Sequence, residues 1–281
     1  MSGKLFIVST PIGNLGDISP RVKHALSESA VVLAEDTRVS VKLLHHMGLK
    51  TPLLSCHEFN ESRRAEVLQE HAMAGNSVAL VSDAGTPLVS DPGYQIVRKA
   101  IELGMTIVPI PGPSAPLAAL VGSGLPSDRF SFEGFLPDKS GDRDKRLRKL
   151  ASDDRTLIFF APPNNIASVL KALQEHFGER QACLARELTK KFEEFIRGSL
   201  SELIEHVEAH PIRGEYVIVV GGAVDDSASA RATEDDVKVR LQSLLAGGAR
   251  LKDAASILAK ESNWASSEIY KLGLSLKDEM R

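Results

Sequence analysis

The chain contains 281 residues, of which 43% are hydrophobic and 25% are charged. This length is enough for two domains, and the composition excludes a chain that is disordered throughout. The net charge of −3, from 34 basic and 37 acidic residues, excludes a histone-like or polybasic protein but not a local basic surface.

The cysteine content and the hydropathy pattern argue against a disulfide-rich, zinc-binding or membrane-spanning protein. Cys56 and Cys183 are too few for a disulfide framework and lack CxxC spacing, so we expect reduced thiols and no metal site. No apolar run approaches the roughly 18–20 residues that cross a membrane. The N-terminus has no signal-peptide pattern, so the sequence predicts a cytoplasmic protein.

The first 110 residues alternate short buried strands with amphipathic helices. We expect strands at 5–8, 31–34, 78–81 and 106–110, and helices near 20–29, 37–48, 60–74 and 93–104. Such alternation is typical of βαβ units and a parallel sheet. Ser19 and Asp91, each followed by proline, are expected to cap helices. Gly48, Gly75 and Gly104 are expected to end them.

The second half of the chain mixes strands and helices differently. Strands are expected at 130–135, 156–160, 182–186, 192–197 and 216–220, with helices near 164–177 and 199–209. Ser199 and Glu202 form a capping-box pattern at the start of the last helix. No helix separates 182–186 from 192–197, which favours antiparallel pairing and therefore a mixed sheet.

These elements predict an α/β protein of two domains with a small helical appendage. The expected parts are a parallel α/β domain at 1–112, a mixed-sheet α/β domain at 113–222, an acidic linker at 223–236 and a helical appendage at 237–281. The Pro- and Gly-rich segment 109–116 is expected to join the two α/β domains.

Three loops follow strands of the first domain, at 9–17, 82–93 and 109–116. Open α/β sheets bind ligands at the carboxyl ends of their strands, so these loops predict a deep cleft. The first loop matches neither GxGxxG nor GxxxxGK[ST], which disfavours a dinucleotide or ATP site. Asp83 is placed to accept hydrogen bonds from a ligand amine or hydroxyl, with a turn or cap aspartate as the alternative.

Charged residues gather at two further places. Residues 35–38 follow the strand at 31–34, and residues 57–61 are expected to follow a further strand that precedes residue 57. Helix capping is the alternative to a functional role for Glu35 and Glu61. Segment 138–149 holds six basic and three acidic residues, which favours either a solvated helix face or contact with phosphates.

Eight motifs occur in an order that resembles one family. They are 10–17 (TPIGNLGD), 34–38 (AEDTR), 81–87 (VSDAGTP), 91–93 (DPG), 109–115 (PIPGPSA), 124–130 (GLPSDRF), 133–137 (EGFLP) and 185–190 (ARELTK). Together they resemble the ribosomal RNA small subunit methyltransferase I family of the tetrapyrrole methylase superfamily. Any one of them alone would be a weak signal.

The resemblance implies a two-domain α/β fold that holds S-adenosylmethionine in the cleft between its domains. It also implies 2′-O-methylation of a cytidine ribose, cytidine 1402, in the decoding region of 16S rRNA within the 30S subunit, by a homodimer. The residues that the resemblance assigns to the cofactor are Pro11, Asp83, Ala84, Gly85, Pro87, Val89, Ser114, Ala115, Phe160, Ala161, Tyr216 and Val217.

Methylation of a ribose hydroxyl needs a nearby group that accepts or polarises its proton. Four candidates remain, with none preferred: Asp36, His57, Glu61 and Glu187. The candidates for contact with RNA phosphates are Arg38, Lys145, Arg146, Arg186 and Lys190.

Two positions depart from the pattern of that family. Ala161 and Asn165 stand where the family has Glu and Arg. Two alternatives stay open beside the rRNA methyltransferase, of which these two positions motivate the second. One is a tetrapyrrole-type methylase that acts on a small molecule, and the other is an RNA-binding or assembly factor without turnover.

Overall fold

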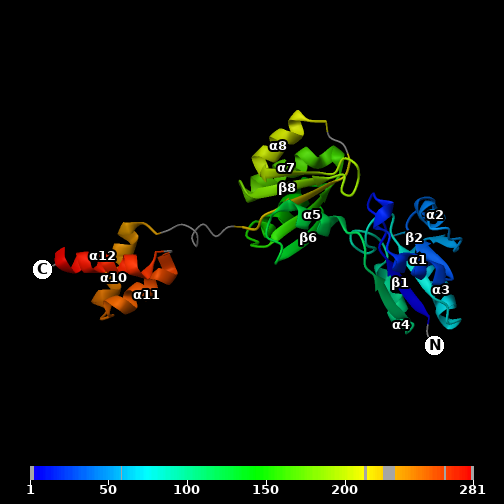
Figure 1. Cartoon of the computed structure of the whole chain (residues 1–281), viewed down its shortest axis with the longest axis horizontal. Helices are drawn as coiled ribbons and strands as arrows, with labels where there is room; N and C mark the ends of the chain where they lie inside the picture. The colour runs from blue at the N-terminus through cyan, green and yellow to red at the C-terminus, as the bar shows by residue number, and fades with distance from the viewer. Residues whose placement is uncertain (1–2, 58, 212–213, 224–231, 263, 280–281) are drawn as a thin grey trace. The chain divides into compact units, whose positions relative to one another are not determined.

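The computed structural model describes residues 3–57, 59–211, 214–223, 232–262 and 264–279. The chain divides into two compact units, Met1–Gly222 and Ala223–Arg281 (Figure 1). The first unit contains two five-stranded sheets, and the second is helical. Most of the predicted linker, 224–231, lies outside the described residues.

The first sheet is parallel throughout, with strand order β3-β2-β4-β1-β5. Its strands are β1 (Lys4–Val8), β2 (Val31–Ala34), β3 (Leu53–Ser55), β4 (Val78–Val81) and β5 (Thr106–Ile110). The intervening helices are η1 (Leu15–Asp17), α1 (Pro20–Glu28), α2 (Thr37–His46), α3 (Glu61–Met73) and α4 (Tyr94–Glu102). The predicted parallel α/β arrangement is confirmed.

Helices cover both faces of this sheet. Ala34 and Val81 belong to a core cluster that contains Leu26 of α1 and Leu44 of α2. Their neighbours along the same strands, Leu33 and Leu80, pack instead with Leu68 of α3 and Ile96 of α4. Every residue of β2 and β4 is buried as a result, as expected for a doubly covered parallel sheet. The carboxyl ends of the strands remain open for loops that bind ligands.

The second sheet is mixed, as the sequence predicts, with strand order β6-β7-β10-β8-β9. Its strands are β6 (Phe130–Phe135), β7 (Thr156–Ala161), β8 (Gln181–Arg186), β9 (Glu194–Ser199) and β10 (Tyr216–Val220). Strands β6 and β7 are parallel, and the other pairs, including β8 with β9, are antiparallel.

Helices also cover both faces of the second sheet. They are α5 (Ala115–Ser123), α6 (Ser140–Leu150), η2 (Pro163–Asn165), α7 (Ile166–Phe177) and α8 (Leu200–Ala209). Leu147, Leu170 and Leu203, from α6, α7 and α8, share one core cluster, whereas Leu120 of α5 belongs to another. The predicted capping box of Ser199 and Glu202 begins α8. Helix α5 was not predicted, because its Pro- and Gly-rich approach hides its first turn.

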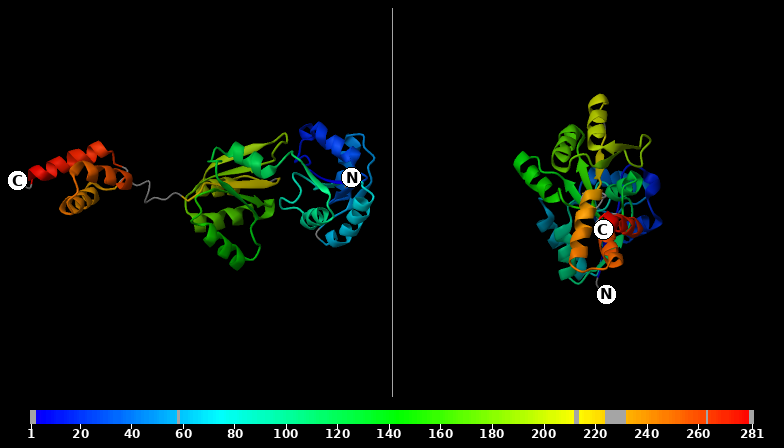
Figure 2. Two further views of the ribbon diagram at one scale, coloured as in Figure 1. Left: turned by 90° about the horizontal axis from the view of Figure 1, so that it is seen from below. Right: turned by 90° about the vertical axis from the view of Figure 1, so that its left-hand side faces the viewer.

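The second unit is a bundle of α10 (Glu234–Ala246), α11 (Leu251–Ser262) and α12 (Ser266–Glu279) (Figure 2). Leu241, Ala254 and Ile269, one from each helix, meet in its core. Helix α10 begins at Glu234, inside the segment that the sequence analysis assigns to the linker. Among the described residues, no helix combines the length and apolar character that a membrane span requires.

The start of α4 corrects one prediction. Asp91 does not cap this helix, whose N-cap is Gly93 without any side-chain hydrogen bond of its own. The carboxylate of Glu61, at the first turn of α3, instead accepts hydrogen bonds from the backbone N–H groups of Gly93 and Gln95. Glu61 is only 8% exposed, so this candidate base is engaged in holding α3 and α4 together. A long-range cap of this kind has no local sequence signal.

We expect Glu61→Ala to destabilise the first unit by about 1–3 kcal/mol, because it leaves the buried N–H group of Gly93 without an acceptor. Glu61→Gln keeps one acceptor oxygen and should cost less. Urea unfolding would measure both changes. The control is Glu70→Ala on the exposed face of α3, which should stay within about 0.5 kcal/mol of wild type. Equal stability of the Glu61→Ala and Glu70→Ala variants would contradict the capping role.

Candidate active site

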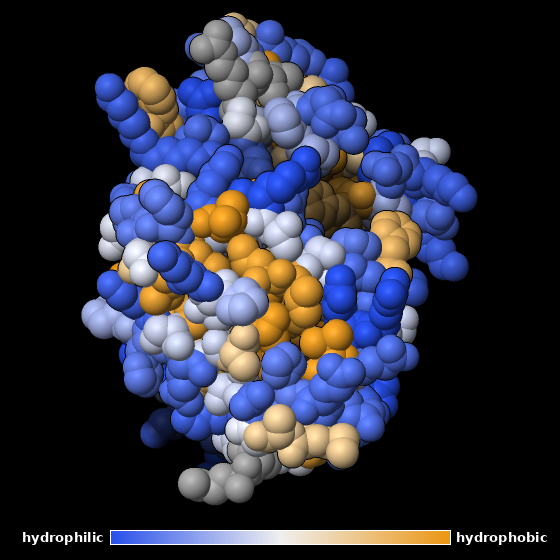
Figure 3. Space-filling view, turned by 90° about the vertical axis from the view of Figure 1, so that its right-hand side faces the viewer, coloured by the Kyte–Doolittle hydropathy of each residue, from blue (hydrophilic) through white to orange (hydrophobic). Residues whose placement is uncertain are grey.

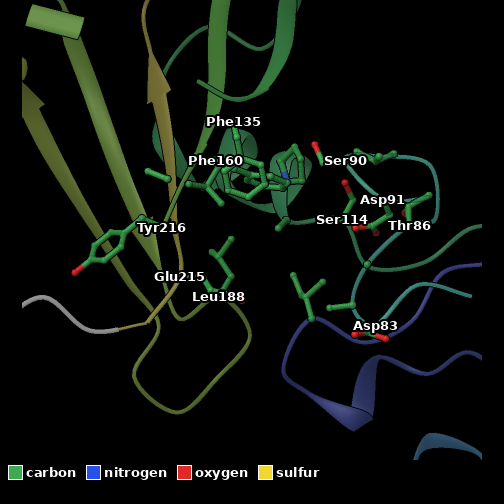
Figure 4. Close-up of a pocket in the computed structure, with 18 of the residues that line it drawn as sticks. Asp83, Thr86, Ser90, Asp91, Ser114, Phe135, Phe160, Leu188, Glu215 and Tyr216 are labelled. Carbon is green, nitrogen blue, oxygen red and sulfur yellow. The ribbon is translucent and has the colours of Figure 1, made fainter. Parts of the chain in front are cut away.

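A cavity of about 400 Å³ lies where the carboxyl ends of the first sheet face the second sheet (Figure 4). The first sheet contributes loops that follow β1, β2, β4 and β5. The second sheet contributes the ends of β6 and β7, the start of β10 and the loop after β8. The volume is within the range of ligand pockets in proteins.

Most residues that the resemblance assigns to the cofactor line this one cavity. They are Asp83, Ala84, Gly85, Val89, Ser114, Ala115, Phe160, Ala161, Tyr216 and Val217. Pro11 and Pro87 are not among the residues that line it. These assignments therefore bring together segments that are distant in the sequence, and their contact with a cofactor remains a prediction.

Hydrogen bonds fix the three loops of the first sheet to one another. Thr10 and Gly85 exchange backbone hydrogen bonds of 2.8 and 3.0 Å, which form an antiparallel bridge between the first two loops. The Thr86 hydroxyl lies 3.0 Å from the Ser9 hydroxyl and donates to the Pro113 carbonyl at 3.2 Å, which reaches the third loop. The floor of the cavity is thus held before any ligand binds.

The loop after β4 contains strained backbone. Leu88 and Ser90 have φ values of +73° and +66°, which non-glycine residues adopt at a cost of about 1–3 kcal/mol each. Ser90 and the neighbouring Val89 line the cavity. Strain of this kind persists where the surrounding structure enforces it, and it is concentrated at ligand sites.

Three carboxylates, of Glu35, Asp83 and Asp91, line the same side of the cavity. Burial, the charge of Glu35 and, to a lesser degree, the charge of Asp83 raise the pKa of Asp91 to about 6, against a smaller opposing effect of a hydrogen bond with Ser82. Burial and the nearby charge of Asp83 also raise the pKa of Glu35. Asp83 accepts a hydrogen bond of 2.9 Å from the backbone of Asp36. Like charges held this close favour a cationic ligand or partial protonation.

Aromatic side chains from the second sheet form a different part of the lining. Phe135 and Phe160 lie with ring centroids 5.3 Å apart, and Phe132 packs edge-on against Phe160 at 5.0 Å. Phe135 is 53% exposed, although it sits in the cavity. An exposed ring beside a cavity offers a flat apolar surface for a ligand.

Glu187 and Lys190 also line the cavity, from the loop after β8. The Lys190 ammonium lies 3.1 Å from Oε1 of Glu187. Glu187 is the one catalytic candidate from the sequence that the structure places in the cavity.

The other three catalytic candidates are engaged elsewhere. Asp36 caps α2 and forms a bidentate pair with Arg38, whose hydrogen bonds lower the pKa of Asp36 to about 2. Such a carboxylate is a weak base. The Asn60 amide nitrogen donates a 3.0 Å hydrogen bond to Nε2 of His57, whose Nδ1 is buried without a partner in the described structure. Glu61 caps α4 as described above.

The residues predicted to contact RNA differ in their ion-pair partners and in their exposure to solvent. Arg186 pairs with Glu194 at 2.6 Å and Arg146 pairs with Glu133 at 3.0 Å, so both guanidinium groups have structural partners. Arg38 is 89% exposed although it pairs with Asp36, and Lys145 is exposed on α6. Lys190 is the member of this set that lines the cavity.

Sequence reasoning missed several residues that line the cavity. For Glu35 a functional role and helix capping were both left open, Asp91 was predicted to cap a helix, and Phe135 and Leu188 were not singled out, although all four fall inside the motifs. The proline that follows Asp91 is typical of a helix start, which explains the wrong prediction of a cap. Motif membership was the available signal for Phe135 and Leu188.

The residues of the cavity fit S-adenosylmethionine. This molecule combines an adenosine, which suits an aromatic and apolar wall, with sulfonium and ammonium charges, which suit carboxylates. The cavity offers both kinds of surface, in Phe135 and Phe160 on one part and in Glu35, Asp83 and Asp91 on another. The loops of the cavity also present backbone N–H and C=O groups. Gly85, in the loop after β4, has a φ of +81°, which glycine adopts without strain and which lets the backbone approach a ligand.

Comparisons with known proteins give one family. Residues 4–204 match the Tetrapyrrole (Corrin/Porphyrin) Methylases. A protein of Pseudomonas aeruginosa named ribosomal RNA small subunit methyltransferase I is 44% identical, over 97% of each chain. Proteins of the same name are 41% identical in Synechocystis, over 98% of this chain and 99% of the relative, and 51% identical in Xylella fastidiosa, over 83% and 86%.

Solved structures share the fold at lower identity. Uroporphyrin-III C-methyltransferase of Thermus thermophilus, complexed with S-adenyl homocysteine, has a TM-score of 0.54 at 19% identity, over 78% of this chain and 97% of that one. A diphthine synthase has a TM-score of 0.59 at 17% identity, over 79% and 90%.

Membership of a methylase family bears out the predicted cofactor, S-adenosylmethionine. The identity of 41–51% over most of both chains narrows the assignment further. The chain belongs to the tetrapyrrole methylase family and, within it, to the ribosomal RNA small subunit methyltransferase I family.

Proposed function

We propose that this protein methylates ribosomal RNA of the small subunit with S-adenosylmethionine, at the 2′-hydroxyl of a cytidine in the decoding region of 16S rRNA, cytidine 1402. The observation that carries the proposal is a single cavity in which carboxylates and aromatic rings meet, within a chain that is alike over its full length to rRNA methyltransferases. Action on the 30S subunit, a cytoplasmic location and a homodimeric state remain predictions that come with it.

The cofactor would be held by both halves of the cavity. Phe160 and Phe135 offer an apolar surface to the adenosine, and Asp83 and Asp91 offer carboxylates to its charged groups. When bound, S-adenosylmethionine supplies a methyl group that its sulfonium has already activated. The chain must therefore align the acceptor hydroxyl and provide for its proton.

Glu187 is the proposed acceptor of that proton. It lines the cavity, whereas Asp36, His57 and Glu61 do not. The ammonium of Lys190, 3.1 Å away, fixes the carboxylate in position and could also contact a phosphate next to the target ribose. Asp36 and Glu61 act as helix caps in this proposal, and Arg38 and Lys145 remain candidates for the more distant RNA backbone.

The experiment that tests the function is transfer of a labelled methyl group. Purified protein is mixed with labelled S-adenosylmethionine and, separately, with 30S particles, free 16S rRNA and a tetrapyrrole precursor. We expect label at a ribose 2′-oxygen of a cytidine in 16S rRNA. Label in the tetrapyrrole would support the small-molecule alternative, and cofactor binding without transfer would support the factor without turnover.

Glu187→Gln is the internal control for the chemical step. It should bind S-adenosylmethionine like wild type and transfer the methyl group roughly 10²–10⁴-fold more slowly, which is the usual contribution of general base catalysis. Transfer at the wild-type rate would remove Glu187 from the proposed role while leaving the reaction itself in place.

We expect loss of the Asp83 carboxylate to weaken cofactor binding by about tenfold, since a charge-assisted contact contributes on the order of 1–2 kcal/mol. Asp83→Ala removes both the charge and the acceptor for the Asp36 backbone, whereas Asp83→Asn removes the charge alone. Calorimetry with S-adenosylmethionine would separate the two effects. Asp128→Asn, at an exposed site before β6, is the control. Unchanged affinity in both Asp83 variants would exclude this residue from the site.

Cofactor affinity should also depend on pH. The raised pKa of Asp91, about 6, means that this carboxyl is negative above pH 6 and neutral below it. Affinity for the cationic cofactor should therefore fall as the pH drops from 7.5 to 5 and reach a plateau above 7. Asp91→Asn should bind more weakly at pH 7.5 and show a flatter profile. A variant that retains the full wild-type pH dependence would rule out Asp91 as its source.

A further inference from the structure

We propose that Phe192, at the tip of the loop formed by residues 187–193, is a platform on which an unpaired RNA base stacks beside the active site. Lys191 supplies a contact to the adjoining phosphate. The inference rests on the proposed function, because it assumes an RNA substrate, and it names the residues that would recognise single-stranded RNA.

Exposure alone does not carry this inference. Phe192 is 72% exposed, but several large apolar side chains of this protein are similarly exposed, among them Met73 and Val121. The face of the molecule drawn in Figure 3 also carries a patch of hydrophobic surface, so exposed apolar side chains are not confined to one loop. Single exposed apolar residues are normal in soluble proteins. What distinguishes Phe192 is the construction and the location of its loop.

The 187–193 loop is closed by hydrogen bonds of its own. The backbone N–H of Thr189 donates to the carboxylate of Glu193 at 2.6 Å. The N–H of Lys190 donates to the Glu187 carbonyl at 3.0 Å, and that of Glu193 to the Lys190 carbonyl at 3.2 Å. Glu187 and Thr189 have φ values of +51° and +66°, which non-glycine residues rarely adopt. The tip is therefore presented by a built turn.

The base of the loop belongs to the cavity. Glu187, Leu188 and Lys190 line it, and Phe192 follows two residues later. The loop also meets the first sheet: a Cβ atom on Gly13 would lie 2.6 Å from Cγ of Lys190 and 3.2 Å from the Thr189 hydroxyl. This close approach holds the base of the loop against the loop after β1, and the exposed ring follows two residues beyond Lys190.

The chemistry of the tip suits single-stranded nucleic acid. The Lys191 ammonium lies 5.6 Å from the centroid of the Phe192 ring, and Lys191 enters none of the ion pairs found among the described residues. An exposed ring that stacks on a base, next to an ammonium that meets a phosphate, is the usual pairing in proteins that bind unpaired strands. An unpaired strand exposes the bases that flank the target ribose, so these bases are free to stack on an aromatic ring.

Phe192→Ala tests the platform in the full-length protein. Binding of a fluorescent single-stranded oligonucleotide with the decoding-region sequence should weaken about five- to hundredfold, the usual loss of one base–aromatic stack. In the methyl-transfer assay the KM for rRNA should rise with little change in kcat or in the KM for S-adenosylmethionine. Phe192→Trp should restore the oligonucleotide affinity and the KM for rRNA. Lys191→Gln should instead reduce the salt dependence of binding. The slope of log K against log salt concentration should become smaller in magnitude by about one, because one phosphate contact is removed.

Phe130→Ala is the matched control, since this ring is also exposed but begins β6, at the opposite end of the strand from Phe135. It should leave RNA binding unchanged, and thermal melting of each variant checks that the fold is retained. Wild-type RNA affinity in Phe192→Ala would overturn the platform while methyl transfer to rRNA still upheld the proposed function. A change of oligomeric state in place of RNA affinity, seen by light scattering, would also overturn it and indicate a protein contact. Wild-type protein that binds no RNA would overturn the platform and the proposed substrate together.

Discussion

The paired hydrogen bonds between Thr10 and Gly85 hold the site together, because they join two loops that leave the same edge of the first sheet. Helices cover both faces of the sheet and bury β2 and β4 completely, so the loops gather at the carboxyl ends of the strands. Thr86 extends the connection to the Pro113 carbonyl. The loops therefore act as one rigid floor, and the second sheet supplies the opposite wall.

The two sides of the cavity differ in their lining. The first sheet contributes the carboxylates of Glu35, Asp83 and Asp91, whereas the second contributes the aromatic rings together with the charged pair of Glu187 and Lys190. The raised pKa values of Glu35 and Asp91 show that these carboxyls are held where ionisation is unfavourable. A cationic ligand relieves that cost, and ligands that bind only the folded state also stabilise it. The same carboxylates that select the ligand thus lower the stability of the empty protein at neutral pH.

The architecture could be predicted from the sequence more fully than the site. Alternating strands and helices gave the parallel sheet, and the adjacency of β8 and β9 gave the antiparallel pair, because both signals are local. The cap of α4 was assigned to Asp91 and is supplied by Glu61, since a cap from another helix leaves no sequence signal near the helix it caps. Ala161, which the family resemblance assigns to the cofactor, lines the cavity, whereas the position of Phe135 in the motif 133–137 was its only sequence signal.

Gly13, in the loop after β1, lies against the side chain of Lys190, in the loop after β8. The two loops can approach this closely because glycine has no side chain. Any larger residue at position 13 would collide with the Lys190 stem, and the positive φ of Gly13, +151°, adds backbone strain to that collision. A larger side chain at position 13 would need a shorter side chain at position 190. A shorter side chain there would lose the ion pair that Lys190 makes with Glu187. The two positions are therefore expected to be epistatic, so that evolution can alter this part of the site only by coupled changes in loops from different sheets.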